Sequence, residues 1–388
     1  MKKVINTENK PVKFWTDDIE EGALEQIKNL ANLPFTFRHV AIMPDCHQGY
    51  GMPIGGVLAT NKVIIPNAVG VDIGCGMCAI KTSLTDIQTE TIKKIMSGIR
   101  KLVPLGFKHH KEKQDEKLMP VHNIIKGGIV EKEYESALTQ IGTLGGGNHF
   151  IEIQKGSDGN IWIMIHSGSR NIGHKVAEHY NKAAKQLNER WHTQIPASWQ
   201  LAFLPLETSE AEEYMSEMQY CIDFAFANRK LMMDNIKAVF REETGNSFSE
   251  KEFINIAHNY ARFENHFNTN VIIHRKGATS AADGEKGIIP GSQGTKSYIV
   301  KGKGNPESFK SCSHGAGRKL GRKEAQRNLD LNYEIAKLDK QNIIHSIRHE
   351  RDLDEAPGAY KNIDKVMKNQ EDLIDILVEL TPLAVIKG

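Results

Sequence analysis

The chain has 388 residues, of which 39% are hydrophobic and 25% are charged, and its formal net charge at pH 7 is +2. This composition is typical of a soluble globular protein and excludes a disordered or fibrous chain. No apolar run approaches the roughly 20 residues of a membrane span, and residues 1–15 lack the apolar core of a secretory signal. We therefore expect no membrane association and a cytoplasmic location.

Short runs of Ile and Val that end in glycine-rich loops predict strands that deliver functional loops. These segments are 43–60, 64–77, 143–154, 161–174, 271–280 and 288–300. Asp158-Gly159, between "FIEIQ" and "IWIMI", predicts a hairpin turn.

Charged segments with apolar residues at helical spacing predict helices. They cover residues 85–102, residues 209–245 with an end at Gly245, and about 362–380 before the strand-like tail "PLAVIKG". Ser249-x-x-Glu252 reads as a capping box that opens a helix containing His258. With no internal repeat or linker, the simplest architecture is one α+β domain over residues 1–388 with a helical insertion at about 175–250.

The stretch "VGVDIGCGMC" contains a C-x-x-C pair, Cys75 and Cys78, of redox or zinc type. A zinc ribbon needs a second pair, which Cys46, Cys221 and Cys312 do not form, and a thioredoxin-like site needs a βαβ context. Without a secretory signal, a disulfide framework is also disfavoured. We expect Cys78 to be buried beside the site, Cys221 to be core packing, and Cys46 to serve packing or a redox role.

Nitrogen, thiolate and carboxylate donors in turns and loops are the ligands of a transition-metal site. The candidates are Asp72, Cys75, His149, His166 and His258. A thiolate with imidazoles suits zinc, whereas an added carboxylate and a phosphate-bearing substrate suit manganese. Two ions that share Cys75 would fit phosphoryl transfer. Glycines at positions 70, 74 and 76 let Asp72 and Cys75 reach one point.

Three glycine loops, "LGGGNH", "PGSQGT" and "HGAGR", let backbone N–H groups approach an anion closely. No Walker motif is present. In the third loop, Gly315, Gly317 and Arg318 precede helix-forming residues, so we expect a phosphate-binding site at a helix N-terminus.

A series of motifs in this order resembles one family, the RtcB-type RNA ligases, over nearly the whole chain. The motifs are "MPDCHQGYG", "GVDIGCGM", "LGGGNHFIEI", "IHSGSRNIGH", "AHNYARFE", "HRKGATSA", "PGSQGT", "SHGAGR", "EAPGAYKNIDKVM" and "VIKG". The resemblance implies an α+β fold with mixed and antiparallel β-sheets around a central metal and nucleotide cleft. It also implies GTP-dependent joining of RNA 3′-phosphate or 2′,3′-cyclic phosphate ends to 5′-hydroxyl ends, in RNA repair or tRNA splicing.

The resemblance further implies two Mn2+ ions, one on Asp72 and His149 and one on His166 and His258, with Cys75 as the bridge. It places the guanylylated residue on His314, which as a neutral imidazole would attack the α-phosphorus of GTP. GMP would then pass to the RNA 3′-phosphate, and the 5′-hydroxyl would displace it.

Several other positions match the family's nucleotide and phosphate contacts. The GTP or GMP contacts are Asn148, His149, Glu152, Ser292, His314, Gly315, Gly317, Tyr360 and Lys387, and the RNA or phosphate contacts are Arg170 and Arg318. Two alternatives stay open, a manganese- or zinc-dependent phosphoesterase and a silent RNA-end binding module. Neither would need His314, Glu152 and Lys387 together. The resemblance leaves open DNA ends as substrates and an archease-like activator as partner.

Overall fold

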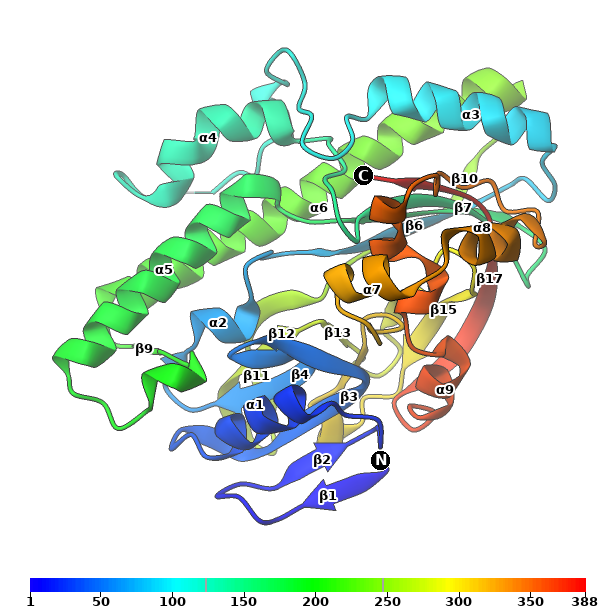
Figure 1. The fold of residues 1–388 in the computed structure, drawn as a ribbon. Helices are drawn as coiled ribbons and strands as arrows, with labels where there is room; N and C mark the ends of the chain where they lie inside the picture. Colours follow the sequence, from blue (N-terminus) through cyan, green and yellow to red (C-terminus); the bar gives the residue numbers. More distant parts are fainter. Residues whose placement is uncertain (123, 246–247) are drawn as a thin grey trace.

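The structure, a computed structural model, describes residues 1–122, 124–245 and 248–388. Helices cover two main β-sheets, and the N-terminal strands lie far from the C-terminus (Figure 1). One strand pair of the first sheet is parallel and the other pairs are antiparallel, so the predicted α+β class with mixed sheets is confirmed. Within the described residues, no helix has the length and apolar character needed to cross a membrane.

The first sheet has six strands in the order β1-β2-β3-β4-β12-β11. Their bounds are β1 Lys3–Ile5, β2 Val12–Phe14, β3 Thr36–Tyr50, β4 Met52–Thr60, β11 Asn259–His266 and β12 Thr269–Lys276. Helix α1 (Glu21–Ala31) packs on β3 and β4 through buried residues that include Ile27 and Leu30. This sheet carries the long strand β3, whose second half leads into the site.

The second sheet has seven antiparallel strands in the order β10-β6-β8-β7-β17-β15-β14. Their bounds are β6 Gly76–Thr82, β7 Phe150–Gly156, β8 Ile161–Ser167, β10 Glu250–Ala257, β14 Lys286–Ile289, β15 Ser297–Gly302 and β17 Ile374–Lys387. The predicted turn at Asp158-Gly159 joins β7 to β8, and Gly159 has φ +83°. Two short pairs complete the strands: β5 (Val63–Ile64) with β9 (Leu204–Pro205), and β13 (Ala278–Ser280) with β16 (Ser311–Ser313).

A single long helix, α6 (Ser209–Thr244), runs across the molecule (Figure 1). The Thr208 side chain accepts a hydrogen bond from the backbone of Ala211 at its start, and the helix ends at Gly245, as predicted. Helices α3 and α5 pack against it. The remaining α-helices of the described residues are α2 Pro66–Val69, α3 Thr89–Leu102, α4 Ile129–Gln140, α5 Arg170–Arg190, α7 Arg322–Asn328, α8 Leu331–Asp339 and α9 Ile363–Lys368.

Two helix predictions were wrong. The segment after Ser249 forms strand β10, which pairs with β6 from Glu250 to Ala257, and His258 lies between β10 and β11. The last helix ends at Lys368, and β17 follows, paired with β15 and with β7. In both places the sheet satisfies the backbone hydrogen bonds and overrides a local preference for helix, because helix formation depends mainly on tertiary packing.

Candidate metal and nucleotide site

Asp72 and Cys75 lie in the tight turn between α2 and β6. The backbone N–H of Cys75 donates to the carbonyl of Asp72 at 3.1 Å, which closes the turn. Gly74 has φ +74°, a region that L-residues rarely adopt. A side chain at Gly76 would clash with the carbonyl oxygen of Ile256 in β10. The glycines therefore allow the turn that brings the carboxylate and the thiol toward the same place.

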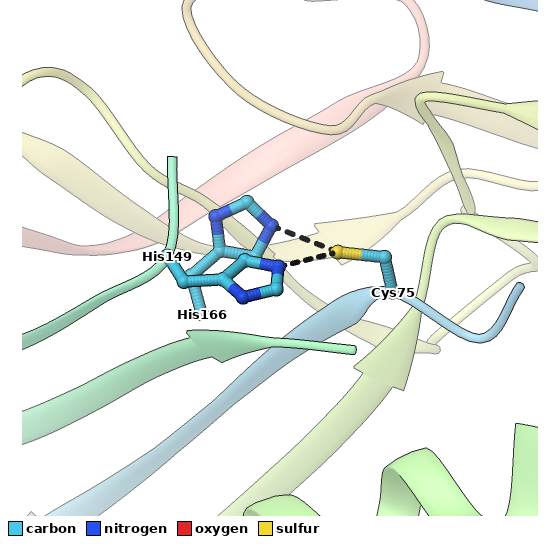
Figure 2. Close-up of side chains that lie close together, drawn as sticks. All are labelled: Cys75, His149 and His166. Atoms are coloured by element: carbon cyan, nitrogen blue, oxygen red, sulfur yellow. Dashed lines mark hydrogen bonds between the residues drawn. The ribbon is translucent and has the colours of Figure 1, made fainter. Parts of the chain in front are cut away.

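Cys75, His149 and His166 form a buried cluster whose ligand atoms all lie within 4.8 Å of one another. The Sγ atom of Cys75 is 3.5 Å from Nε2 of His149 and 3.3 Å from Nε2 of His166, and both rings point at the sulfur (Figure 2). Asp72 joins through its Oδ2 atom, 3.3 Å from Nε2 of His149. Thiolate, imidazole and carboxylate donors converging on one point fit a transition-metal ion.

Backbone carbonyls fix the orientation of both histidine rings. Nδ1 of His149 donates to the carbonyl of Leu144 at 2.9 Å, and Nδ1 of His166 donates to the carbonyl of Asn148 at 3.1 Å. These hydrogen bonds turn each Nε2 toward the cluster, where it can bind a metal ion. A metal-binding histidine is held in this way by a hydrogen bond from its other nitrogen.

His258 extends the cluster into a row of four imidazoles. The ring centroids are 5.3 Å apart for His149 and His166, 5.1 Å for His166 and His258, and 4.8 Å for His258 and His314. Nδ1 of His258 is buried with no hydrogen-bond partner in the described part of the chain, as expected for an atom that awaits a ligand. Burial lowers the pKa of His166 and of His258 well below its usual value, so both rings are neutral.

The protonation state of Cys75 is set by its surroundings. Burial, with the Asp72 carboxylate beside it, raises the pKa of the thiol. Ligation to a metal requires the thiolate, so metal binding at this residue is coupled to release of a proton.

His314 is held by a buried carboxylate that the sequence analysis did not single out. Nδ1 of His314 donates to Oδ2 of Asp45 at 2.6 Å, and the backbone N–H groups of His314 and Gly315 donate to the same oxygen. Burial alone would raise the pKa of Asp45, but the charge and hydrogen bond of His314 outweigh it and lower the pKa. The hydrogen bond to Asp45 fixes the orientation of the ring and turns Nε2 away from the carboxylate, an arrangement that suits a nucleophile.

A cavity of about 940 Å³ opens beside two members of this row of histidines. His166 and His314 line it, together with nearly all of the predicted nucleotide contacts. Those contacts are Asn148, Glu152, Ser292, Gly315, Gly317, Tyr360 and Lys387, and Arg318, which was predicted to contact RNA or phosphate, lines the cavity as well. The volume is large enough for a nucleotide.

Glu152 and Ser292 present polar groups to this cavity. Burial raises the pKa of Glu152 to about 8, against the opposing effects of the Gln154 hydrogen bond and the Lys387 charge. Oε2 of Glu152 accepts a hydrogen bond from Gln154 at 2.6 Å. Ser292 is held through Thr295, whose Oγ1 accepts from the Ser292 backbone at 2.7 Å. Both side chains are buried and fixed in orientation.

Glu355 joins three of the predicted contact residues at one end of the cavity. Its carboxylate lies 3.0 Å from Nη1 of Arg318 and 3.3 Å from Nζ of Lys387, and it accepts a hydrogen bond from the hydroxyl of Tyr360. Arg322 adds a fourth group at 3.6 Å. The buried carboxylate therefore balances three cations that line the cavity, Arg318, Arg322 and Lys387.

Comparison with known proteins identifies the family. The family model described as "tRNA-splicing ligase RtcB" matches residues 26–129 and 121–388. The chain belongs to the RtcB family.

Curated RtcB relatives match over 92–100% of their length. The "RNA-splicing ligase RtcB" of Escherichia coli strain K12 is 39% identical, and the alignment covers 100% of this chain and 99% of that protein. The "tRNA-splicing ligase RtcB" of Thermococcus kodakarensis is 31% identical over 95% of this chain and 92% of that protein. The "RNA-splicing ligase RtcB" of Mycobacterium tuberculosis is 30% identical over 94% of this chain and 100% of that protein.

The two arginines predicted from the RtcB resemblance lie in different places. Arg318 lines the cavity but does not sit at a helix N-terminus as expected, because α7 starts only at Arg322 and Arg318 is bound to Glu355. Arg170 is the first residue of α5, with φ +61°, and its Nε donates to Thr143 Oγ1 at 3.0 Å. Among the cavity-lining residues that the structure describes, Arg170 is absent, so it lies on the metal-cluster side.

Asp45 and Glu355 were missed because their motifs were read for other residues. Asp45 is part of "MPDCHQGYG", in which only Cys46 was given a possible role. Glu355 begins "EAPGAY", in which only Tyr360 was predicted to contact the nucleotide. An acidic residue inside a recognised RtcB motif was the available signal. All five cysteines are free, and Cys46, Cys78 and Cys221 are buried, as expected for packing.

Proposed function

We propose that the protein is a GTP- and manganese-dependent RNA ligase. It joins an RNA 3′-phosphate or 2′,3′-cyclic phosphate end to a 5′-hydroxyl end, in RNA repair or tRNA splicing. Membership of the RtcB family supports the RNA substrate and the ligase class. The observation that carries the proposal is the position of His314, which lines the nucleotide-sized cavity and lies beside the buried cluster.

His314 acts as the nucleophile toward GTP. Its Nε2 lone pair attacks the α-phosphorus, the N–P bond forms, and the bond to the pyrophosphate oxygen breaks, so pyrophosphate leaves. The Nδ1 proton stays on the ring and is held by Asp45. As positive charge develops on the imidazole, this carboxylate stabilises it.

Metal ions fit the donor set beside His314. Asp72 and His149 would hold one Mn2+ ion, His166 and His258 would hold the other, and Cys75 would be shared by both. The two ions would neutralise negative charge on the phosphate groups as GMP is transferred. Manganese is proposed from the family resemblance, since the same donors also suit zinc. The protein contributes rings whose Nε2 atoms are already oriented toward the thiol.

The far part of the cavity binds the guanine nucleotide. Ionised Glu152 accepts hydrogen bonds from guanine N1–H and N2–H, and Lys387 donates to its carbonyl edge. Ser292 and Tyr360 contact the nucleotide from the cavity wall, while Asn148, Gly315, Gly317 and Arg318 face its phosphates. Glu355 keeps Lys387, Arg318 and Tyr360 in place.

The remaining steps concern the RNA. Water adds to the phosphorus of a cyclic end and breaks its bond to the 2′-oxygen, which leaves a 3′-phosphate. An oxygen of this 3′-phosphate attacks the phosphorus of GMP, and the N–P bond to His314 breaks. The 5′-hydroxyl then attacks the activated 3′-phosphorus and GMP leaves. Arg170, beside the cluster, meets RNA phosphates. We include an archease-like activator as a partner of the protein. We also propose that the protein is cytoplasmic.

We also propose that residues 1–388 form one catalytic domain, with the helical segment at about 175–250 as an insertion. The second sheet supports this, because it joins β6 from the N-terminal half with β17 at the end of the chain.

The test is labelling of the protein with α-labelled GTP and Mn2+, followed by a denaturing gel. The wild type should carry acid-labile label, and His314→Ala should carry none. Label that survives in His314→Ala, or no label on the wild type, contradicts the nucleophile. A protein that opens cyclic phosphate without labelling would instead be a phosphoesterase, the competing function. Ligation of 3′-phosphate, cyclic-phosphate and DNA ends then defines the substrate.

A further inference from the structure

An aromatic side chain is presented to solvent on a loop whose backbone is joined to the loop of the ligand His149. Phe107 is 99% exposed and belongs to residues 106–111, which we name the Phe107 loop. The loop is anchored at Gly106, whose N–H donates to the carbonyl of Gly145 at 3.0 Å and whose carbonyl faces Nη2 of Arg170 at 3.5 Å. Gly106 has φ +63°, so the backbone turns sharply before Phe107.

The anchor touches the site itself. A Cβ placed on Gly145 would lie 2.6 Å from Nδ1 of His149 and would clash with the guanidinium of Arg170. Phe107 directly follows Gly106, whose backbone is hydrogen-bonded to Gly145, and Gly145 packs against the ligand histidine His149. The Asp72 side chain is one-third exposed and is not among the described residues that line the cavity. The cluster therefore also reaches solvent at Asp72, outside the cavity.

The loop also carries two lysines that have no acidic partner among the described residues. Lys108 and Lys111 are exposed and form no salt bridge with any residue that the structure describes, whereas Lys113 is paired with Glu135. Leaving a phenylalanine side chain in water forgoes about 1.5–3 kcal/mol of burial free energy. An exposed aromatic ring next to unpaired lysines is an arrangement by which proteins bind single-stranded nucleic acid.

We propose that the Phe107 loop is a stacking platform for single-stranded RNA next to the end being joined. A nucleobase stacks on the Phe107 ring, and Lys108 and Lys111 hold adjacent phosphates. Arg170, between the loop and His149, receives the phosphate nearest the cluster. RNA and GTP then reach the cluster by different routes, because the Phe107 loop lies outside the cavity lining as described. The inference rests on the proposed function, since it requires an RNA substrate.

The test measures binding of a short fluorescent single-stranded RNA with a 3′-phosphate by anisotropy, without GTP. Phe107→Ala should raise Kd by roughly 5- to 150-fold, which corresponds to about 1–3 kcal/mol per stacked base. Phe107→Trp should retain wild-type affinity, and Phe107→Leu should behave like Phe107→Ala because it keeps apolar area but not the π-face. Thermal unfolding checks that each variant folds.

The matched control is Phe263→Ala on β11. Phe263 is also an exposed aromatic residue and follows a cation, Arg262, but it belongs to an edge strand of the first sheet. Its substitution should leave Kd unchanged. Equal weakening by Phe263→Ala, wild-type affinity of Phe107→Ala, or full affinity of Phe107→Leu would each overturn the platform.

Salt dependence tests the two lysines. The double variant Lys108→Ala/Lys111→Ala should lower the slope of log Kd against log salt by about 0.7 per lysine. An unchanged slope would remove the lysines from the binding surface. Labelling of the wild type by GTP, measured in parallel, tests the proposed function separately, because RNA binding in this assay needs no nucleotide.

Discussion

Asp45→Asn removes one negative charge beside His314 while it keeps the shape of the side chain. Oδ2 of Asp45 accepts three hydrogen bonds, from the His314 ring at 2.6 Å, from the His314 backbone at 3.2 Å and from the Gly315 backbone at 3.3 Å. An amide oxygen in the same position can accept all three. The variant should therefore fold and bind GTP with little change.

The expected effect is on the rate of guanylylation. The imidazole gains positive charge as its bond to phosphorus forms, and the buried Asp45 carboxylate is positioned to stabilise that charge. A hydrogen bond to a charged group contributes about 1.5–3 kcal/mol. Loss of the charge should slow transfer of GMP to His314 by roughly 10- to 150-fold.

The assay is single-turnover labelling with α-labelled GTP at saturating Mn2+. Asp45→Ala should be slower than Asp45→Asn, because it also frees the ring to rotate. Asp18→Asn, which removes an exposed carboxylate from a neighbouring loop, is the control for net charge. If Asp45→Asn is labelled at the wild-type rate and unfolds at the wild-type temperature, the carboxylate does not act through His314.

Three further predictions concern metal, guanine and pH. Cys75→Ala should abolish both labelling and Mn2+ retention in equilibrium dialysis, whereas Cys78→Ala should keep both and lose about 1 kcal/mol of stability; equal loss in the two variants would contradict Cys75 as a ligand. GTP should bind more tightly as pH rises through about 8, the pKa of Glu152, because guanine N–H groups need the ionised carboxylate; the KM of Glu152→Gln should be higher and independent of pH in this range. Burial lowers the pKa of Lys276 from 10.5 to about 7, so between these values the unfolded chain binds the extra proton and stability rises with pH, by up to about 1.4 kcal/mol per pH unit. Urea unfolding of Lys276→Met should show a flatter pH dependence, and an unchanged one would refute the shift.

The sequence predicted those features that depend on short, local patterns. The turn with Asp72 and Cys75 follows from glycines at fixed spacing, and α6 follows from long helical periodicity that ends at Gly245. Family motifs also indicated which residues line the cavity, because each motif supplies its own stretch of backbone.

Features that depend on distant partners were not predictable in this way. The segment after Ser249 has a capping signature, yet it forms a strand because the edge of β6 is available to pair with it. The bond between Asp45 and His314 joins residues 269 positions apart, and Glu355 meets Lys387 only after β17 has paired with β7. No local pattern encodes such pairings, since tertiary contacts decide them.

The convergence of the ligands depends on two buried polar residues of α6, Asn228 and Arg229, which the sequence analysis did not single out. Oδ1 of Asn228 accepts from the backbone of Gly142 and Thr143, in the loop that leads to His149. Its Nδ2 donates to Ser167 and Gly168, directly after His166. One amide thus holds the loops of two ligand histidines against the same helix.

Arg229, the next residue, ties the remaining ligand segments to this helix. Its Nη1 donates to the carbonyl of Gly74 at 3.0 Å, beside Cys75, and to that of Ser167 at 2.9 Å. Its Nε donates to Asn255 in β10, three residues before His258. The guanidinium is fully buried, and these acceptors offset part of the cost of burying it. Because four ligand segments end on one pair of side chains, a shift of α6 would move them together and preserve their mutual distances, which explains how donors far apart in sequence can form one site.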